Sequence, residues 1–271
     1  MDDATSEGFL TAAGKRLEYA WVNRAPEPGE TVLVFLHEGL GCIDLWRDFP
    51  ATLSAACNMP GLVYSRAGYG RSDGIDLPRP ITYQEDEARD ALTDVLDTLG
   101  IKRAILIGHS DGGTIALIHA GLDTCGRILG AATMAAHVFN EEVCLQGIRE
   151  ARKVWETTDL REKLKRYHGD NVDTAFFGWN DTWQRDDYWH WKVEKYLPDI
   201  TCPLLVMQGR DDHYGSERQV DSIVAGAGGS ARKLMVADCG HNPHFDQPDE
   251  TIAAITAFVR EVIDDSVAAG R

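Results

Sequence analysis

The sequence predicts a doubly wound, mostly parallel α/β sheet with a helical insertion. Short uninterrupted apolar runs bounded by turn residues are typical of strands buried on both faces. Amphipathic helical patterns alternate with these runs, which favours parallel strands joined by helices. Residues 138–199 contain no such run and hold five of the seven tryptophans. We therefore expect an α/β core from residues 1–137 and 200–271 and a helical cap from 138–199.

The expected strands follow from local patterns. Residues 8–22 predict a hairpin that turns at Ala13 and Gly14. Continuous apolar runs predict buried strands at 31–37, 61–65, 103–108 and 203–209, with weaker candidates at 127–136 and 232–237.

Two helices have clear patterns. Residues 84–99 repeat apolar side chains at intervals of three and four, and residues 249–263 do the same. Thr82 and Glu85 predict a capping box at the start of the first helix, and Gly100 predicts its end.

Composition limits the classes of function. The 271 residues include 27 Lys and Arg against 43 Asp and Glu, a formal net charge of −16. A surface with this net negative charge repels phosphate backbones and anionic lipid. We therefore expect no nucleic-acid or membrane partner. The first ten residues resemble no signal peptide, and no apolar run of about 18 residues is present, so a cytoplasmic location is expected. The six cysteines are scattered and predict small core residues without a metal site.

Residues 108–112, Gly-His-Ser-Asp-Gly, carry the strongest chemical signal. They follow a predicted buried strand and precede an apolar helix, which is the context of a nucleophile elbow. Ser110 is therefore the candidate nucleophile. The backbone N–H of Asp111, at the start of the helix, is a candidate donor to an oxyanion.

A serine hydroxyl needs a base, and the base needs an orienting acid. Asp211 and Asp212 follow the strand at 203–209, and His241 follows the strand at 232–237. Because carboxyl ends of parallel strands meet at one edge, these groups can converge on Ser110. His241 is the expected base, and His244 is its nearest rival.

Five segments, FLHEGLGCIDLW, YSRAGYGRSD, GHSDGG, QGRDD and CGHNPHFDQPD, together resemble the α/β-hydrolase superfamily along nearly the whole chain. The resemblance is to the small bacterial group of esterases, enol-lactonases and meta-cleavage-product hydrolases. It implies the α/β-hydrolase fold with a cap. It also favours Asp212 as the acid, because the family places this residue three positions after the strand-end glycine, here Gly209; Asp211 stays the alternative. Arg66 and Tyr69 match a family motif that braces the active-site loops.

The loop after residues 31–37 departs from the family pattern, because His37 is followed by Glu38 and not by glycine. We expect the second oxyanion donor to be the N–H of Gly39, with Leu40 as the alternative. Glu38 itself could tune the site or form an ion pair. The residues expected to line an apolar, aromatic-walled substrate pocket are Leu40, His137, Trp179 and Trp183.

These features predict a serine hydrolase that cleaves an ester or lactone of a small molecule through Ser110, His241 and Asp212, with no cofactor or metal. A C–C bond hydrolase of vinylogous diketones and an amide hydrolase use the same machinery and stay open. A cofactor-independent dioxygenase and a non-catalytic binding protein are less favoured alternatives. The sequence leaves a homodimer open.

Overall fold

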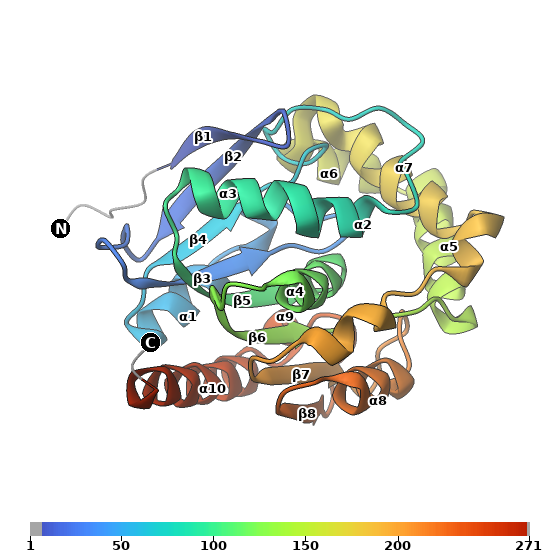
Figure 1. The fold of residues 1–271 in the computed structure, drawn as a ribbon. Helices are drawn as coiled ribbons and strands as arrows, with labels where there is room; N and C mark the ends of the chain where they lie inside the picture. The colour runs from blue at the N-terminus through green and yellow to red at the C-terminus, as the bar shows by residue number, and fades with distance from the viewer. Residues whose placement is uncertain (1–6, 270–271) are drawn as a thin grey trace.

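One eight-stranded sheet, in the order β1-β2-β4-β3-β5-β6-β7-β8, organises the computed structural model, which describes residues 7–269 (Figure 1). Most of the segment on which the signal-peptide expectation rests, residues 1–6, lies outside the described residues. The strands are β1 (Glu7–Ala12), β2 (Lys15–Val22), β3 (Thr31–Leu36), β4 (Gly61–Tyr64), β5 (Arg103–His109), β6 (Ile128–Met134), β7 (Leu204–Gly209) and β8 (Ala231–Val236).

The strand directions confirm the predicted fold class. β1 and β2 form the expected antiparallel hairpin, whose turn residues Ala13 and Gly14 both have positive φ. β2 also pairs antiparallel with β4, and every other neighbouring pair is parallel.

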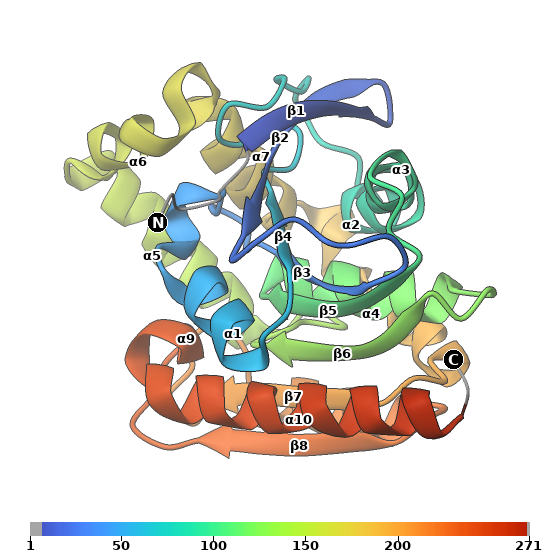
Figure 2. The ribbon, with the colours of Figure 1, turned by 90° about the vertical axis from the view of Figure 1, so that its left-hand side faces the viewer.

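Helices cover both faces of the sheet. α1 (Phe49–Cys57) and α10 (Pro248–Ala268) pack together on one face, which Figure 2 shows in front of the strands. α3 (Leu92–Thr98), α4 (Asp111–Leu122) and α8 (Glu217–Gly226) lie on the other face. The continuous apolar runs are explained by this arrangement. In β3, Val32 and Val34 enter the core under α3 and α4, while Leu33 and Phe35 enter the core under α1 and α10.

The helix predicted at residues 84–99 is continuous but not uniform. It consists of α2 (Tyr83–Asp86), a π-helical turn (η2, Glu87–Ala91) and α3, and it ends at Gly100 with φ +67° as expected. The predicted capping box is wrong. The Thr82 hydroxyl donates to the Asp86 carboxylate at 2.8 Å, and Glu85 accepts from Lys195 at 2.9 Å. Both side chains therefore have partners other than the helix N-terminus.

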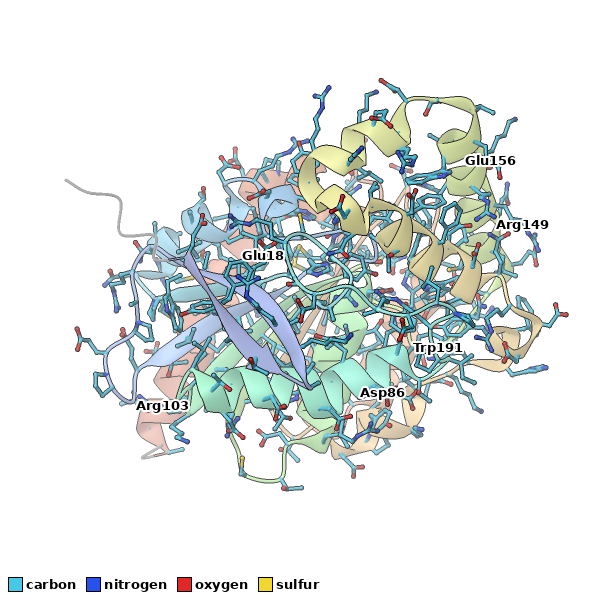
Figure 3. The ribbon with its side chains drawn as sticks, turned by 90° about the horizontal axis from the view of Figure 1, so that it is seen from above. Glu18, Asp86, Arg103, Arg149, Glu156 and Trp191 are labelled. Atoms are coloured by element: carbon cyan, nitrogen blue, oxygen red, sulfur yellow. The ribbon has the colours of Figure 1, made fainter. Side chains whose placement is uncertain are left out.

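Between β6 and β7, where every residue is described, the regular structure is helical apart from an isolated bridge between Phe139 and Lys192. Its elements are α5 (Glu142–Thr157), α6 (Leu160–His168), η3 (Gly169–Asn171), α7 (Val172–Trp183), η4 (Asp186–His190) and η5 (Glu194–Asp199). α5, α6 and α7 lie beyond the carboxyl ends of the parallel strands (Figure 1). In Figure 3, Arg149 and Glu156 point outward from α5, whereas Trp191 lies inside.

The last part of this helical segment packs against the core. η5 lies on α4 so closely that a Cβ at Gly121 would overlap the carbonyl oxygen of Tyr196. The C-terminal turn of residues 138–199 thus also helps to cover the α4 face. Within residues 7–269 no helix is both long and apolar enough to span a membrane.

The cysteines are all free, and the prediction of small core residues holds for only some of them. Cys42, Cys144 and Cys239 are buried, and Cys57 and Cys202 are half-buried. For Cys125 the prediction is wrong, because this residue is exposed in the loop after α4, where Asp123 accepts a hydrogen bond from its backbone N–H.

Candidate active site

The turn between β5 and α4 holds Ser110 in a strained conformation, with φ 50° and ψ −116°. Its N–H donates to Met134 O on β6 at 2.8 Å, and its carbonyl accepts from Thr114 N at 3.0 Å. Glycines on either side permit the turn. A Cβ at Gly108 would meet the backbone of Gly112, and a Cβ at Gly112 would overlap Leu36 O on β3. The sequence Gly-x-Ser-x-Gly is therefore required by backbone contacts.

The structure brings Ser110, His241 and Asp212 together from the ends of three strands. His241 Nε2 lies 3.0 Å from Ser110 Oγ. On the other side of the ring, Nδ1 lies 2.9 and 3.0 Å from the two carboxylate oxygens of Asp212. Asp212, not Asp211, makes this contact, and Asp211 is exposed to solvent. The rival His244 is buried beside His109, with ring centroids 4.7 Å apart.

The charges in this chain of contacts favour a neutral imidazole beside an ionised carboxylate. Burial opposes ionisation of Asp212, but attraction to His241 and hydrogen bonds from His241 and the Tyr214 N–H lower its pKa overall. Burial lowers the pKa of His241 below its usual 6.5, although Asp212 acts in the opposite direction. An ionised Asp212 accepts the Nδ1 proton, so Nε2 is left free to accept a proton from Ser110.

The loop after β3 is held from behind by the buried Arg66. Its Nη2 donates to Glu38 O at 2.8 Å and to His37 O at 3.3 Å, and its Nη1 lies 3.6 Å from the Asp111 carboxylate. Gly39 and Leu40 both line the cavity at Ser110, so each remains a predicted second oxyanion donor. The predicted first donor, the Asp111 N–H, belongs to the first residue of α4.

The Asp111 side chain points into the protein and is 1% exposed. It accepts from Tyr83 OH at 2.8 Å and from Gln84 Nε2 at 3.1 Å. Tyr83 OH in turn accepts from Trp183 Nε1 at 2.9 Å, which ties α7 to the start of α4. A buried carboxylate with these partners stabilises the turn after Ser110.

A cavity opens at Ser110 and holds about 630 Å³ of empty space, its mouth included. All four predicted pocket residues, Leu40, His137, Trp179 and Trp183, line it. Sequence reasoning missed four more lining residues: Cys144, Ile148, Tyr214 and Asn242. The first two are four residues apart on α5, and this helical spacing on the most amphipathic helix of the insertion was the available signal. Burial raises the pKa of the Cys144 thiol well above its usual range, so that wall is uncharged.

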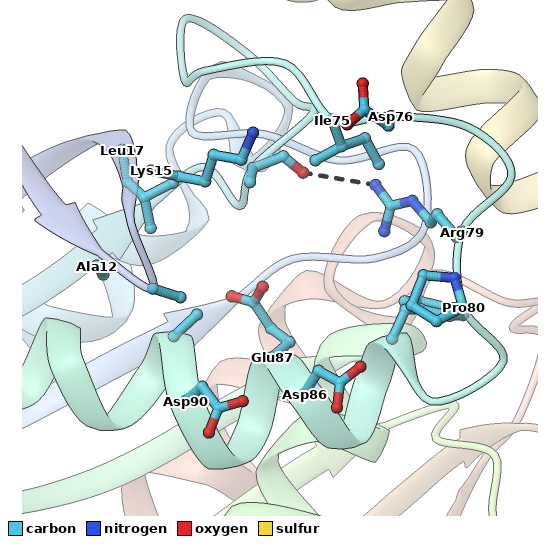
Figure 4. A pocket seen from close by; sticks show the side chains of 14 residues that line it. Ala12, Lys15, Leu17, Ile75, Asp76, Arg79, Pro80, Asp86, Glu87 and Asp90 are labelled. Carbon is cyan, nitrogen blue, oxygen red and sulfur yellow. Dashed lines mark hydrogen bonds between the residues drawn. The ribbon is translucent and has the colours of Figure 1, made fainter.

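A second cavity, of about 680 Å³, lies between the β1–β2 hairpin, the loop at 67–80 and the helical stretch that begins at Tyr83 (Figure 4). Lys15, Arg79 and Glu87 surround it, and Arg79 Nη2 donates to Ala67 O at 3.5 Å. None of the described residues that line it is a Ser, Cys or His, so it offers no nucleophile–base pair. The candidate active site is therefore the cavity at Ser110.

The fold and the Ser-His-Asp contacts at the strand ends are those of serine hydrolases built on an α/β sheet. A model of the alpha/beta hydrolase family matches residues 33–254, and the chain belongs to this family. The resemblance predicted from the five sequence segments is thereby confirmed.

Two curated relatives are hydrolases. The chain is 30% identical to the human protein "Serine hydrolase BPHL" over 192 residues, which cover 68% of this chain and 63% of the human protein, just under two thirds of its length. It is 25% identical over 223 residues to the 2-hydroxy-6-oxo-6-phenylhexa-2,4-dienoate hydrolase of Comamonas testosteroni, covering 72% of this chain and 74% of that protein.

Among solved structures, the enol-lactonase from Burkholderia xenovorans LB400 superposes with a TM-score of 0.68 at 21% identity. The match covers 93% of this chain and all of the lactonase. At this identity the likeness supports the fold alone.

Proposed function

We propose that the protein hydrolyses a small, uncharged ester or lactone by two-step acyl transfer through Ser110, His241 and Asp212. The observation that supports this most directly is the continuous contact from Ser110 Oγ through the His241 ring to Asp212, beside a largely apolar cavity that Ser110 and His241 line. Both distances lie within the range over which a base takes a proton.

In the first step His241 Nε2 accepts the Ser110 proton as Oγ attacks the substrate carbonyl. Asp212 keeps the Nδ1 proton in place and stabilises the imidazolium that forms. The N–H groups of Asp111 and Gly39 stabilise the oxyanion. The imidazolium then protonates the leaving group, and the same base activates water to release the acyl group.

The lining of the cavity supports an apolar, uncharged substrate. Trp179 and Trp183 supply large aromatic surfaces, which favour apolar and aromatic groups. None of the described residues around the cavity is a Lys or Arg, and its one acidic residue is Glu38. A substrate carboxylate buried there would lack a cationic partner. Burial of an unpaired ion costs on the order of several kcal/mol. Neutral esters and lactones therefore fit better than dienoates.

C–C bond and amide hydrolysis use the same three side chains and form the second candidate. Relatives support the C–C reaction, since the Comamonas protein is named for a dienoate. The absence of a cation from the described cavity lining argues against such a substrate here. A dioxygenase or a binding protein would not need Asp212 in contact with His241, and this contact is present.

The test is a hydrolysis screen of neutral aryl and alkyl esters, lactones, aryl amides and a dienoic diketone with the wild type and Ser110→Ala. We expect turnover of neutral esters or lactones by the wild type, no turnover by Ser110→Ala, and labelling of the wild type alone by a fluorophosphonate. Turnover of the best ester by Ser110→Ala would refute the proposal, and so would a wild type that cleaves only the diketone.

A further inference from the structure

A second histidine, His109, contacts the backbone of the proposed base, His241. It precedes Ser110 in the chain, and its Nε2 lies 2.8 Å from the main-chain oxygen of His241. A carbonyl oxygen only accepts hydrogen bonds, so Nε2 carries a proton and donates it. His241 is thus held at two places: its ring contacts Ser110, and its backbone contacts the residue before Ser110.

The orientation of the His109 ring is fixed on its remaining sides. The side chain is 1% exposed and packs against the rings of His244 and Trp46, at centroid distances of 4.7 and 6.3 Å. Its Nδ1 lies 3.6 Å from Glu38 Oε2 and has no hydrogen-bond partner among the described residues. Nδ1 therefore faces a carboxylate at the end opposite to the His241 carbonyl. A carboxylate only accepts, so this contact is attractive when Nδ1 carries a proton as well as Nε2.

The loop after β3 is shaped to place this carboxylate. Gly41 leaves the space that Glu38 Oε2 fills, since a Cβ there would overlap that oxygen. Burial opposes the charge on Glu38, but interactions with His109 and Arg66 lower its pKa overall. Glu38, which stands where the family pattern has glycine, is thus directed at His109.

We propose that Glu38 and His109 are positioning residues: together they form a carboxylate–imidazolium pair that holds the His241 backbone at the distance from Ser110 that proton transfer requires. This inference rests on the proposed function. The two pairs differ in protonation: Asp212 orients a neutral ring that accepts the Ser110 proton, whereas Glu38 faces a ring whose two nitrogens both donate and which anchors the His241 backbone. His109 does not line the cavity, so its effect should fall on the chemical step and not on substrate binding.

The first test compares His109→Phe with His109→Gln. Phenylalanine keeps a ring against His244 and Trp46 but removes the donor, whereas the glutamine amide can reach His241 O with an N–H. For His109→Phe we expect kcat per titrated active site to fall about 10- to 100-fold with KM within about twofold, because a small misplacement of a catalytic group has effects of this order. His109→Gln should recover kcat to within about threefold of the wild type.

The second test asks whether Glu38 acts through His109. Glu38→Gln alone should lower kcat roughly 3- to 10-fold, and in the His109→Phe background it should lower kcat no further, since residues acting as a unit are not additive. Additive losses would overturn the proposal, as would wild-type kcat in His109→Phe. If His109→Phe does not fold, the same comparison of single and double variants is made with His109→Leu.

Thermal stability distinguishes a positioning role of His109 from a purely structural one. A purely structural role would lower the melting temperature of His109→Phe while kcat per titrated site stayed at the wild-type value, and this result also overturns the proposal. Failure of the proposed function looks different: the wild type itself would show no ester turnover and no fluorophosphonate labelling.

Discussion

The two walls of the catalytic cavity are built in different ways. The wall at the strand ends, which carries Ser110 and His241, is fixed by backbone contacts such as that of Gly112 with Leu36 O. The wall from α5 and α7 is made of side chains, and its Trp179 ring packs against the Phe176 ring at a centroid distance of 6.1 Å. The first wall tolerates almost no change of shape, whereas the second can change shape when one side chain is replaced.

The walls also differ in charge. Behind the strand ends lie buried charged groups with fixed partners, among them Asp212 with His241 and Asp111 with Arg66. The α5–α7 wall contributes Cys144, Ile148, Trp179 and Trp183 to the cavity, none of which is charged near neutral pH. We therefore expect the first wall to carry the chemistry and the second to select the substrate. Variants on each side can test this division.

The largest effect is expected for Asp212→Asn. An amide next to His241 Nδ1 favours the tautomer that leaves Nε2 protonated, so kcat should fall about 10⁴-fold while KM changes little. Asp211→Asn is the matched control and should retain kcat within about twofold, because Asp211 is exposed and Asp212 is the carboxylate in contact with His241. Steady-state kinetics on the best ester decides the matter, and an inactive Asp211→Asn with an active Asp212→Asn would reverse the assignment.

Gly112→Ala tests the rigidity of the strand-end wall. The added Cβ would overlap Leu36 O, so β3 or α4 must move, and we expect a loss of roughly 3 kcal/mol or more in the free energy of unfolding. The control is Gly74→Ala, where a Cβ meets only Asn171 Oδ1 at 3.4 Å. Its stability in urea should stay within about 0.5 kcal/mol of the wild type. Equal stability of the two variants would show that the elbow can relax.

Trp179→Ala tests the adaptable wall. The indole lies against Gly39, where a Cβ would overlap its Cδ1, so its removal enlarges the cavity beside the predicted oxyanion donor. For small esters kcat/KM should fall about tenfold, in line with the loss of about 1–3 kcal/mol of apolar contact, and bulkier aryl esters should lose less. Trp189→Ala, at an exposed position on η4, should leave kcat/KM unchanged for both small and bulky aryl esters. A uniform loss across all esters would mean that Trp179 supports the loop and does not select substrates.

The division between the walls also explains what the sequence could predict. Gly108, Ser110 and Gly112 lie within five consecutive residues, and strand order places Asp212 and His241 at the same edge, so local pattern and topology were sufficient for them. The choice of Asp212 over Asp211 came from family spacing. Cys144, Ile148 and Tyr214 reach the cavity only through the packing of α5 and of the loop after β7. That packing depends on contacts distant in sequence, which periodicity does not specify.

The smallest expected effect is a difference in pH dependence. Only the strand-end wall should contain the group whose ionisation controls kcat/KM. Burial lowers the pKa of His241 below 6.5, and only the neutral ring accepts the Ser110 proton. The rate constant kcat/KM should therefore be constant at neutral pH and decline about tenfold per pH unit below an apparent pKa under 6.5. Trp179→Ala should show the same acidic limb, because tryptophan does not titrate and the α5–α7 wall contributes no other group that ionises there. A limb above about pH 7, or one that moves in Trp179→Ala, would mean that a group other than a buried His241 controls the reaction.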